Sequence, residues 1–299
     1  MEPDADNPAE GKTVKKMQKH YINVLAIAGS DSGAGAGIQA DLKTCLANGV
    51  YATTVISAVT AQNTCGVKDF CRIELPMIEA QLDAVITDVR PDAVKTGMLP
   101  DDASIALVGE ILRKYGMENI VVDPVMVATS GDSLTSGDTG DALMNHLFPI
   151  ATVVTPNIPE AERLSGLSIR TPDDILAAAE HIIAKTGVAN ILIKGGHTTS
   201  ENGLITDVLV GRDGTVTRYE HELLPSNNTH GTGCSLSSAI AANLAKGHNV
   251  TEACRQAIGW LSAAIKSGQS LVLGHGHGPV NHLWELKDFC TKEIRYIWN

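Results

Sequence analysis

Short apolar runs that alternate with helical periods constrain the fold of this chain more than any other feature of its sequence. Runs typical of buried strands are found at 21–29, 51–62, 93–99, 119–125, 151–157 and 190–196. Helical periods lie between them, at 37–48, 76–89, 101–115 and 171–186. Such alternation builds a mostly parallel central sheet with helices on both faces. We therefore predict an α/β fold with three layers.

The rest of the sequence adds further strands and helices and contains no sign of a second domain. Residues 203–211 and 215–224 flank Asp213–Gly214 and are typical of a hairpin, and helical periods follow at 232–246, 250–267 and 279–290. The helix at 171–186 has clear boundaries, because Thr171 can cap its start and Gly187 its end. No linker or solenoid repeat interrupts the chain, so we expect one domain over 21–299. Residues 1–20 are polar, and we expect a disordered leader there.

Composition and charge exclude several classes of function. The chain carries 23 Lys and Arg against 34 Asp and Glu, a net charge of −11, and has no basic block, so we expect no nucleic-acid partner. No run approaches about 18 apolar residues, so no membrane partner is expected. The six cysteines form no C-x-x-C pair, which argues against a zinc ribbon or a redox motif. Without a secretory signal, we expect reduced thiols and a cytoplasmic location.

Ligands of parallel sheets lie beyond the carboxyl ends of the strands, and the first predicted strand ends in a glycine-rich turn. This turn, residues 29–37, reads G-S-D-S-G-A-G-A-G and leads into a helix. Its spacing matches neither the dinucleotide fingerprint nor the phosphate loop. Close approach of the backbone to a small ligand, a simple tight turn and nucleotide binding all remain open for it.

A second glycine-rich turn, residues 228–234, opens the helix predicted at 232–246. Free N–H groups at the start of a helix form a cradle for negative charge, here around Gly231, Thr232 and Gly233. The helix dipole is expected to lower the pKa of the Cys234 thiol, which could then act as a nucleophile or general base. The alternative is a small buried cysteine at the start of a core helix.

Charged residues also follow three of the predicted strands. Asp123 closes one strand, Glu160 lies three residues after Asn157, and Lys194 closes another. The two carboxylates suit a Mg²⁺ site and the lysine suits a phosphate, whereas each alone could be a capping or solvated loop charge. Together at one sheet edge they favour phosphoryl transfer, which depends on positioning and charge neutralisation.

Seven segments, taken in order, resemble the hydroxymethylpyrimidine/phosphomethylpyrimidine kinases of thiamine biosynthesis, members of the ribokinase-like superfamily. They are A-I-A-G-S-D-S-G-A-G-A-G-I-Q-A-D-L-K-T (26–44), T-A-Q-N-T (60–64), K-T-G-M-L (95–99), V-D-P-V-M-V-A-T-S-G-D (122–132), T-P-N-I-P-E (155–160), I-K-G-G-H (193–197) and T-H-G-T-G-C-S-L-S (229–237). The resemblance extends from about residue 22 to 290 and implies a single-domain ribokinase-like sandwich. Thr96, where Ile is expected, and the first turn depart slightly from the family pattern.

The resemblance also implies roles for individual residues at the substrate end of the site. Gln62 and Asp41 would bind the pyrimidine, with Gly29 and Met98 lining its pocket. The carboxamide of Gln62 can pair with an aminopyrimidine edge through one donor and one acceptor. Asp41 taken alone would be a solvated helix charge, so its role depends on the resemblance.

At the phosphate end, the resemblance implies a charged site. Asn157 and Glu160, in an N-x-x-E motif, would organise Mg²⁺ and water with Asp123, and Lys194 would contact nucleotide phosphates. The anion hole would comprise Gly231, Thr232, Gly233 and Cys234, with Cys234 as base for the substrate hydroxyl.

The implied reaction uses ATP and Mg²⁺ to phosphorylate 4-amino-5-hydroxymethyl-2-methylpyrimidine and then its monophosphate. The family also suggests a homodimer. A pyridoxal or pyridoxine kinase shares the scaffold and is one alternative, and a non-enzymatic ligand sensor is another. The segment G-H-G-H-G-P (274–279), with His282 beyond it, could be a metal tract, but a backbone role near the site is the stronger interpretation.

Overall fold

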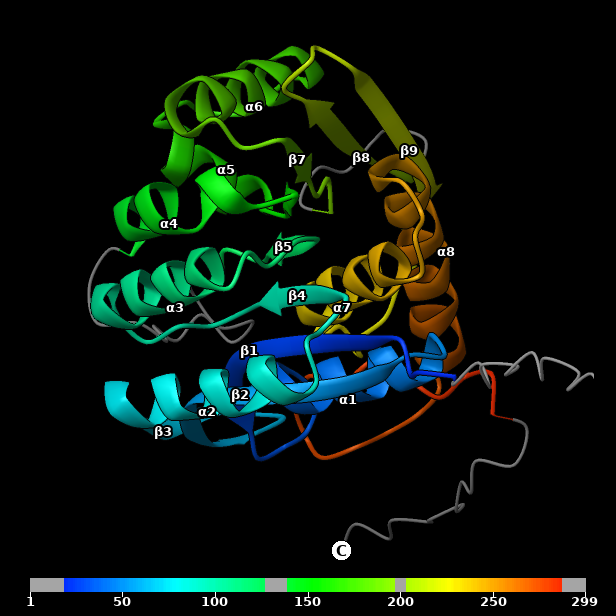
Figure 1. Ribbon diagram of the computed structural model, residues 1–299. Coiled ribbons are helices and arrows are strands. Elements are labelled where there is room, and N and C mark those ends of the chain that lie inside the picture. The colour runs from blue at the N-terminus through cyan, green and yellow to red at the C-terminus, as the bar shows by residue number, and fades with distance from the viewer. Residues whose placement is uncertain (1–18, 127–138, 197–202, 287–299) are drawn as a thin grey trace, which may run out of the picture.

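The computed structural model describes residues 19–126, 139–196 and 203–286 (Figure 1). Its centre is one nine-stranded sheet with the order β3-β2-β1-β4-β5-β6-β7-β8-β9. The strands are β1 (Asn23–Asp31), β2 (Tyr51–Asn63), β3 (Gly66–Arg72), β4 (Ala93–Thr96), β5 (Ile120–Val122), β6 (Val153–Val154), β7 (Asn190–Ile193), β8 (Leu204–Gly211) and β9 (Val216–Glu222).

Most of the sheet is parallel, as the strand–helix alternation predicts. β1 pairs in parallel with β2 and β4, and the parallel pairing continues through β5 and β6 to β7. The edges are antiparallel, through β3 on one side and the β8–β9 hairpin on the other. The hairpin was predicted, whereas β3 was not, because three of the seven residues of G-V-K-D-F-C-R are charged and no apolar alternation is visible in it.

Helices cover both faces of the sheet and complete the three layers (Figure 1). They are α1 (Gly37–Ala47), α2 (Leu75–Asp88), α3 (Asp102–Lys114), α4 (Gly140–His146), α5 (Ile158–Ser165), α6 (Pro172–Thr186), α7 (Thr232–Ala245) and α8 (Val250–Gly268). Successive strand residues point to opposite faces, so Leu25 and Val122 join the core beneath α2 to α6, whereas Val24 and Val121 join the core beneath α1, α7 and α8.

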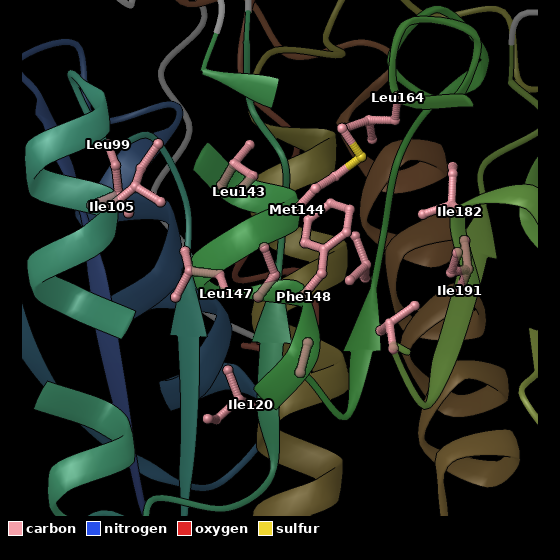
Figure 2. Packing of buried hydrophobic residues seen from close by; sticks show 14 of the residues in the cluster. Leu99, Ile105, Ile120, Leu143, Met144, Leu147, Phe148, Leu164, Ile182 and Ile191 are labelled. Carbon is pink, nitrogen blue, oxygen red and sulfur yellow. The ribbon is translucent and has the colours of Figure 1, made fainter. Parts of the chain in front are cut away.

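The larger core gathers around the segment that follows α4. Leu147 and Phe148 are fully buried and lie between Ile105 of α3 and Ile182 of α6 (Figure 2). The apolar side chains of this segment therefore fill the space between α3 and α6.

The predicted helix at 171–186 is confirmed with both of its boundaries. Thr171 and Asp174 form a capping box at the start of α6, and Gly187 ends it in the left-handed region with φ 72°. The part of the chain that the structure describes contains no helix long and apolar enough to cross a membrane.

The helix predicted at 279–290 is wrong over residues 279–286, where the chain forms an isolated bridge at Pro279 and a turn at 282–285. There the amide of Asn281 donates to the carbonyl of Ala264, and His282 is buried beside Ser235, so contacts with α7 and α8 outweigh the local helical period. Residues 287–290 lie outside the described residues, as does nearly all of the predicted leader.

One buried ion pair connects strand β4 to the helices α1 and α7 that cover one face of the sheet. The ammonium of Lys95, on β4, donates to both carboxylate oxygens of Asp41, on α1, at 2.8 and 2.9 Å, and both side chains are 0% exposed. Ser238 of α7 donates to the same carboxylate at 2.7 Å. The three side chains fix α1 and α7 against β4.

Replacing Lys95→Met should cost about 3–5 kcal/mol of unfolding free energy, because it leaves the buried carboxylate of Asp41 without its counter-charge. The double change Lys95→Met with Asp41→Leu should recover most of this loss, since an apolar pair needs no compensation. Urea denaturation measures both values. Lys185→Met is the matched control, because Lys185 and Asp141 form an exposed pair 3.9 Å apart. A loss for Lys95→Met as small as the control's would contradict this account.

Candidate active site

A cavity of about 770 Å³ opens at the carboxyl ends of the parallel strands. Every residue that the sequence places in a site lines it, with the exception of Asp41. The lining includes Gly29, Gln62, Met98, Asp123, Asn157, Glu160, Lys194, Gly231, Thr232, Gly233 and Cys234. The parallel topology therefore brings together side chains that follow different strands and lie far apart in the sequence.

The first glycine-rich turn is organised around Asp31, which the sequence analysis did not single out. Its carboxylate accepts hydrogen bonds from the backbone amides of Gly33, Gly35 and Ala36 at 2.7, 3.0 and 2.8 Å. Burial acts to raise the pKa of Asp31, but the hydrogen bonds from His230 and these amides outweigh it and hold the pKa below its ordinary value. These amides are therefore occupied by a carboxylate of the chain itself.

Gln62 and Met98 lie at the end of the cavity next to this turn. The backbone of Gln62 is held by the Ser32 hydroxyl, which donates to its carbonyl at 2.7 Å and accepts from its amide at 2.8 Å. A Cβ on Gly29 would come within 2.9 Å of the Met98 sulfur, so glycine is needed for this close packing. The amide of Gln62 is thus presented to the cavity from a fixed backbone.

Asp41 does not reach this end of the cavity, and its predicted place against the pyrimidine is corrected. Its carboxylate is fully buried and both oxygens are engaged by Lys95, with Ser238 as a further donor. Burial raises the pKa of Asp41 in spite of the opposing charge of Lys95. Asp41 supports the site from below through the ion pair described above.

The second glycine-rich turn meets the first one directly. Gly231 has φ 81°, and a Cβ there would lie 1.9 Å from the carbonyl oxygen of Gly35. No side chain caps the start of α7, and its first residues line the cavity; the amide of Thr232 donates to the carbonyl of Thr229 at 3.3 Å. This is the geometry of an anion site at a helix N-terminus.

A charged cluster lies beside this helix start. The ammonium of Lys194 is 3.2 Å from Asp123, whose carboxylate is 2% exposed. A Cβ on Gly233 would lie 3.4 Å from that carboxylate and 3.5 Å from the ammonium, which places both next to α7. Burial acts to lower the pKa of Lys194, but Asp123 and Glu160 outweigh it and raise the pKa, so the lysine stays charged.

Glu160 completes the cluster and also begins a helix. Its carboxylate accepts from the Asn157 amide at 2.8 Å, and the Asn157 side chain accepts from the Glu160 amide at 2.9 Å, a capping box at the start of α5. Burial raises the pKa of Glu160 to about 7, with Lys194 opposing and Asp123 reinforcing the shift. One interaction therefore serves the fold and leaves a poorly compensated carboxylate at the cavity.

The pKa of the Cys234 thiol is raised, whereas the helix dipole predicted that it would be lowered. Burial raises the pKa of its thiol to about 11; Lys95 opposes this shift, and Asp41 and Asp123 add to it. Desolvation therefore outweighs the dipole, and the side chain is a thiol at neutral pH. Its position at the start of α7, lining the cavity, agrees with the sequence.

Within residues 19–126, 139–196 and 203–286, no three His, Cys, Asp or Glu side chains form a metal-binding group. The oxygens of Asp123 already face Lys194, Thr155 and Ser237, at 3.2 to 3.4 Å. Such a site suits a cation that takes one or two protein carboxylates and completes its shell with phosphate and water, as Mg²⁺ does.

The glycine–histidine segment at 274–279 makes backbone contacts. The amides of His275 and Gly276 both donate to the Thr64 hydroxyl at 3.2 Å, and a Cβ on Gly276 would lie 2.0 Å from the Thr64 carbonyl oxygen. The two histidine side chains at 275 and 277 are exposed. The segment packs against the β2–β3 turn that follows Gln62, which is the backbone role favoured above.

Four functional candidates were missed by the sequence analysis. Besides Asp31, they are His230, whose ring is 2.9 Å from Asp31, and the pair of Asp207 and His221, 3.1 Å apart at the β8–β9 end of the cavity. His230 falls within the quoted T-H-G-T-G-C motif, so the motif could have indicated it. The pairing of β8 with β9 brings Asp207 and His221 together, and no local pattern signals that contact.

Known proteins resemble this chain in sequence over most of its length. Residues 31–281 match the family model described as phosphomethylpyrimidine kinase. A hydroxymethylpyrimidine/phosphomethylpyrimidine kinase of Rhizobium meliloti is 46% identical over 258 residues, which are 86% of this chain and 96% of that protein. A probable chloroplastic thiamine biosynthetic bifunctional enzyme of Oryza sativa is 44% identical over 269 residues, 89% of this chain. The chain covers only 48% of that relative, about half of its length.

Two solved structures show the same architecture. A phosphomethylpyrimidine kinase from Clostridium difficile has a TM-score of 0.72 at 41% identity and covers 82% of this chain and 100% of its own. A pyridoxal kinase from Bacillus subtilis, in complex with ADP, has a TM-score of 0.80 at 36% identity and covers 90% of this chain and 100% of its own. The predicted single-domain ribokinase-like sandwich is confirmed.

Replacing Glu160→Gln should stabilise the fold above neutral pH. Because the folded pKa of about 7 exceeds the ordinary 4.5, the favourable contribution of the protonated carboxyl is fully present below about pH 4.5 and is lost as pH rises through 7. Gln stays neutral and can still accept from the Asn157 amide. We expect about 1–3 kcal/mol of added stability at pH 8 and none near pH 4.5, measured by urea denaturation.

The matched control for this change is Glu180→Gln, on the exposed face of α6, which should leave the pH dependence unaltered. Equal stability of wild type and Glu160→Gln at pH 8 would contradict the assignment of Glu160 as a destabilising charge.

Proposed function

The chain belongs to the phosphomethylpyrimidine kinase family, and from that premise we propose that it transfers a phosphoryl group from ATP to 4-amino-5-hydroxymethyl-2-methylpyrimidine and then to the resulting monophosphate. The observation that carries the proposal is a single cavity that joins the Gln62 amide to an anion site at the start of α7. One end suits an aminopyrimidine edge, and the other suits the transferred phosphate.

In the first reaction, the oxygen of the substrate hydroxymethyl group attacks the γ-phosphorus of ATP, and the bond from that phosphorus to the β-phosphate oxygen breaks to release ADP. The N–H groups of Gly231, Thr232 and Gly233 would stabilise charge on the transferred phosphoryl group. Lys194 would neutralise charge on the neighbouring phosphates of the nucleotide. We assign to Cys234 the acceptance of the hydroxyl proton. Its high pKa makes the thiolate scarce but strongly basic.

Mg²⁺ would be held by the carboxylates of Glu160 and Asp123 together with phosphate oxygens, and when bound it would neutralise charge on the phosphates. The raised pKa of Glu160 suits this role, because a nearby cation would stabilise the ionised carboxylate.

The relation to pyridoxal kinases makes vitamin B6 phosphorylation the second candidate. The structure of a Bacillus subtilis pyridoxal kinase superposes with a TM-score of 0.80. One assay separates the two candidates: ADP release is followed with the pyrimidine alcohol, with its monophosphate and with pyridoxal. The proposal expects turnover with both pyrimidines at a higher kcat/KM than with pyridoxal, and the reverse order would overturn it.

The homodimer and the cytoplasmic location stay predictions. Light scattering of the purified chain tests the first, and cell fractionation tests the second.

Replacing Gln62→Leu should raise the Kd of the pyrimidine alcohol by leaving its polar edge unpaired, at a cost of about 1–3 kcal/mol. ATP affinity should change little, since the phosphate site lies at the start of α7. Calorimetric titration measures both constants. If the Kd of the pyrimidine stays unchanged, the substrate lies elsewhere in the cavity.

Replacing Cys234→Ala should lower turnover of the pyrimidine alcohol by about 10²–10⁴-fold, the usual range for a lost general base. The monophosphate should be affected far less, because its attacking phosphate oxygen is already ionised near pH 7. The pH dependence gives a second readout. Since the thiol pKa is about 11, the wild-type rate with the alcohol should rise with pH from 7 to 9, and this rise should vanish in the variant.

The alanine variant keeps every backbone N–H group of the turn, so ATP binding should survive. Turnover of the alcohol within twofold of wild type would reject Cys234 as the base and restore its interpretation as a packing residue.

A further inference from the structure

Asp207 and His221 form a buried polar pair on one face of the β8–β9 hairpin. In the strand register Asp207 lies opposite Tyr219. His221 lies opposite Ile205, two residues along each strand, so all four side chains project from the same face. Tyr219 and Ile205 are buried, and the Asp207 side chain is 7% exposed. A carboxylate in such surroundings is costly unless both of its oxygens have hydrogen-bond partners.

One oxygen of Asp207 is bonded to the backbone next to Lys194. This oxygen, Oδ1, accepts from the amide of Gly195 at 2.7 Å. The ladder between β7 and β8 ends at Ile193, so the amide lies beyond the last pair. A Cβ on Gly195 would lie 2.1 Å from the carbonyl oxygen of Thr206, so the two backbones stay in contact there. The carboxylate therefore replaces the ladder hydrogen bond at the point where β7 has ended.

The backbone of Lys194 is fixed on both sides of its Cα. The Lys194 amide donates to the carbonyl of Pro156 at 2.9 Å, and the following amide, that of Gly195, donates to Asp207. Because each peptide group is planar, these two bonds set the direction in which the Lys194 side chain leaves the backbone. That direction brings its ammonium to 3.2 Å from Asp123 in the cavity. Loss of the bond to Asp207 would therefore displace the ammonium.

His221 holds the carboxylate of Asp207 in this orientation. Its Nε2 lies 3.1 Å from Oδ2, the oxygen that does not face Gly195. The hydrogen bond with Asp207 raises the pKa of His221, with burial opposing the shift, so the ring is held as a donor. The terminal torsion of a carboxylate has a broad range, so without this donor Oδ1 is free to turn away from the amide.

We propose that Asp207, oriented by His221, is a positioning residue that places the Lys194 ammonium for contact with the phosphates of the nucleotide. It acts through the Gly195 amide. The inference deepens the proposed function and rests on it, since that function assigns Lys194 to the phosphates. A misplacement of about 1 Å at such a group can cost about 10²-fold in rate, so a contact on β8 can control the phosphate end of the site.

A double-mutant cycle between Asp207 and Lys194 tests the inference. The Kd of ATP with Mg²⁺ is measured by calorimetry in the absence of any pyrimidine, for Asp207→Leu, Lys194→Met and the double variant. We expect each single change to raise the Kd by about tenfold or more, because Lys194→Met removes the charge and Asp207→Leu misplaces it. In the Lys194→Met background, Asp207→Leu should raise the Kd by less than about twofold, since no ammonium remains to be positioned.

Two further variants separate positioning from general damage to the fold. Asp207→Asn keeps an oxygen for the Gly195 amide and faces His221 with its amino group, so we expect an ATP Kd within about twofold of wild type. His221→Phe removes the donor to Asp207 and should raise the Kd by about threefold to tenfold, again only where Lys194 is present. The matched control is Tyr219→Phe, which breaks a hydrogen bond from the same face of the hairpin to α8 and should leave the Kd unchanged.

If the effects of Asp207→Leu and Lys194→Met multiply in the double variant, Asp207 acts on ATP independently of Lys194 and the inference is overturned. An unchanged Kd in either single variant would overturn it as well. Thermal unfolding checks that each variant is folded, and the same cycle with His221→Phe decides the outcome if Asp207→Leu does not fold. Turnover of the pyrimidines is measured separately. A chain that shows the coupling but phosphorylates neither pyrimidine would contradict the proposed function and leave the positioning role supported.

Discussion

The buried ion pair between Lys95 and Asp41 fixes helix α1 against strand β4. Two charges without solvent contact lose their hydration, and only close bidentate geometry at 2.8 and 2.9 Å offsets that cost. The pair is therefore stable in only one arrangement of β4 and α1. Ser238 includes α7 in this arrangement, because its hydroxyl donates to Asp41. Because α1 begins at the first glycine-rich turn and α7 at the second, this arrangement fixes both ends of the site.

The two glycine-rich turns pack directly against each other. A Cβ on Gly231 would collide with the carbonyl of Gly35, and a Cβ on Gly35 would collide with the ring of His230. Gly231 lets its turn pack on the backbone of Gly35, and Gly35 leaves room for the His230 ring, which brings the substrate end and the anion end of the cavity into one space. The reaction needs this proximity, since phosphoryl transfer depends mainly on positioning.

The electrostatics of the site oppose those of the whole chain. A protein with a net charge of −11 repels anions at long range, so phosphate binding must come from Lys194 and from the N–H groups at the start of α7. The same neighbourhood holds Asp123 and Glu160, which keep Lys194 charged and leave Glu160 with a pKa of about 7. The site is thus prepared for a cation as well as for phosphate.

The sequence by itself determined the layers, the parallel sheet and the group of residues at its carboxyl edge, because strand and helix periods are local and parallel strands end at one edge. It missed β3, α4 and α5, which are short or polar segments with weak periods. Only the tertiary structure decided that Asp41 faces Lys95 instead of the cavity. It also joined Asp31 to His230, which are 199 residues apart, and raised the pKa of Cys234. Partners and burial of this kind arise from packing between distant elements, and no local pattern records them.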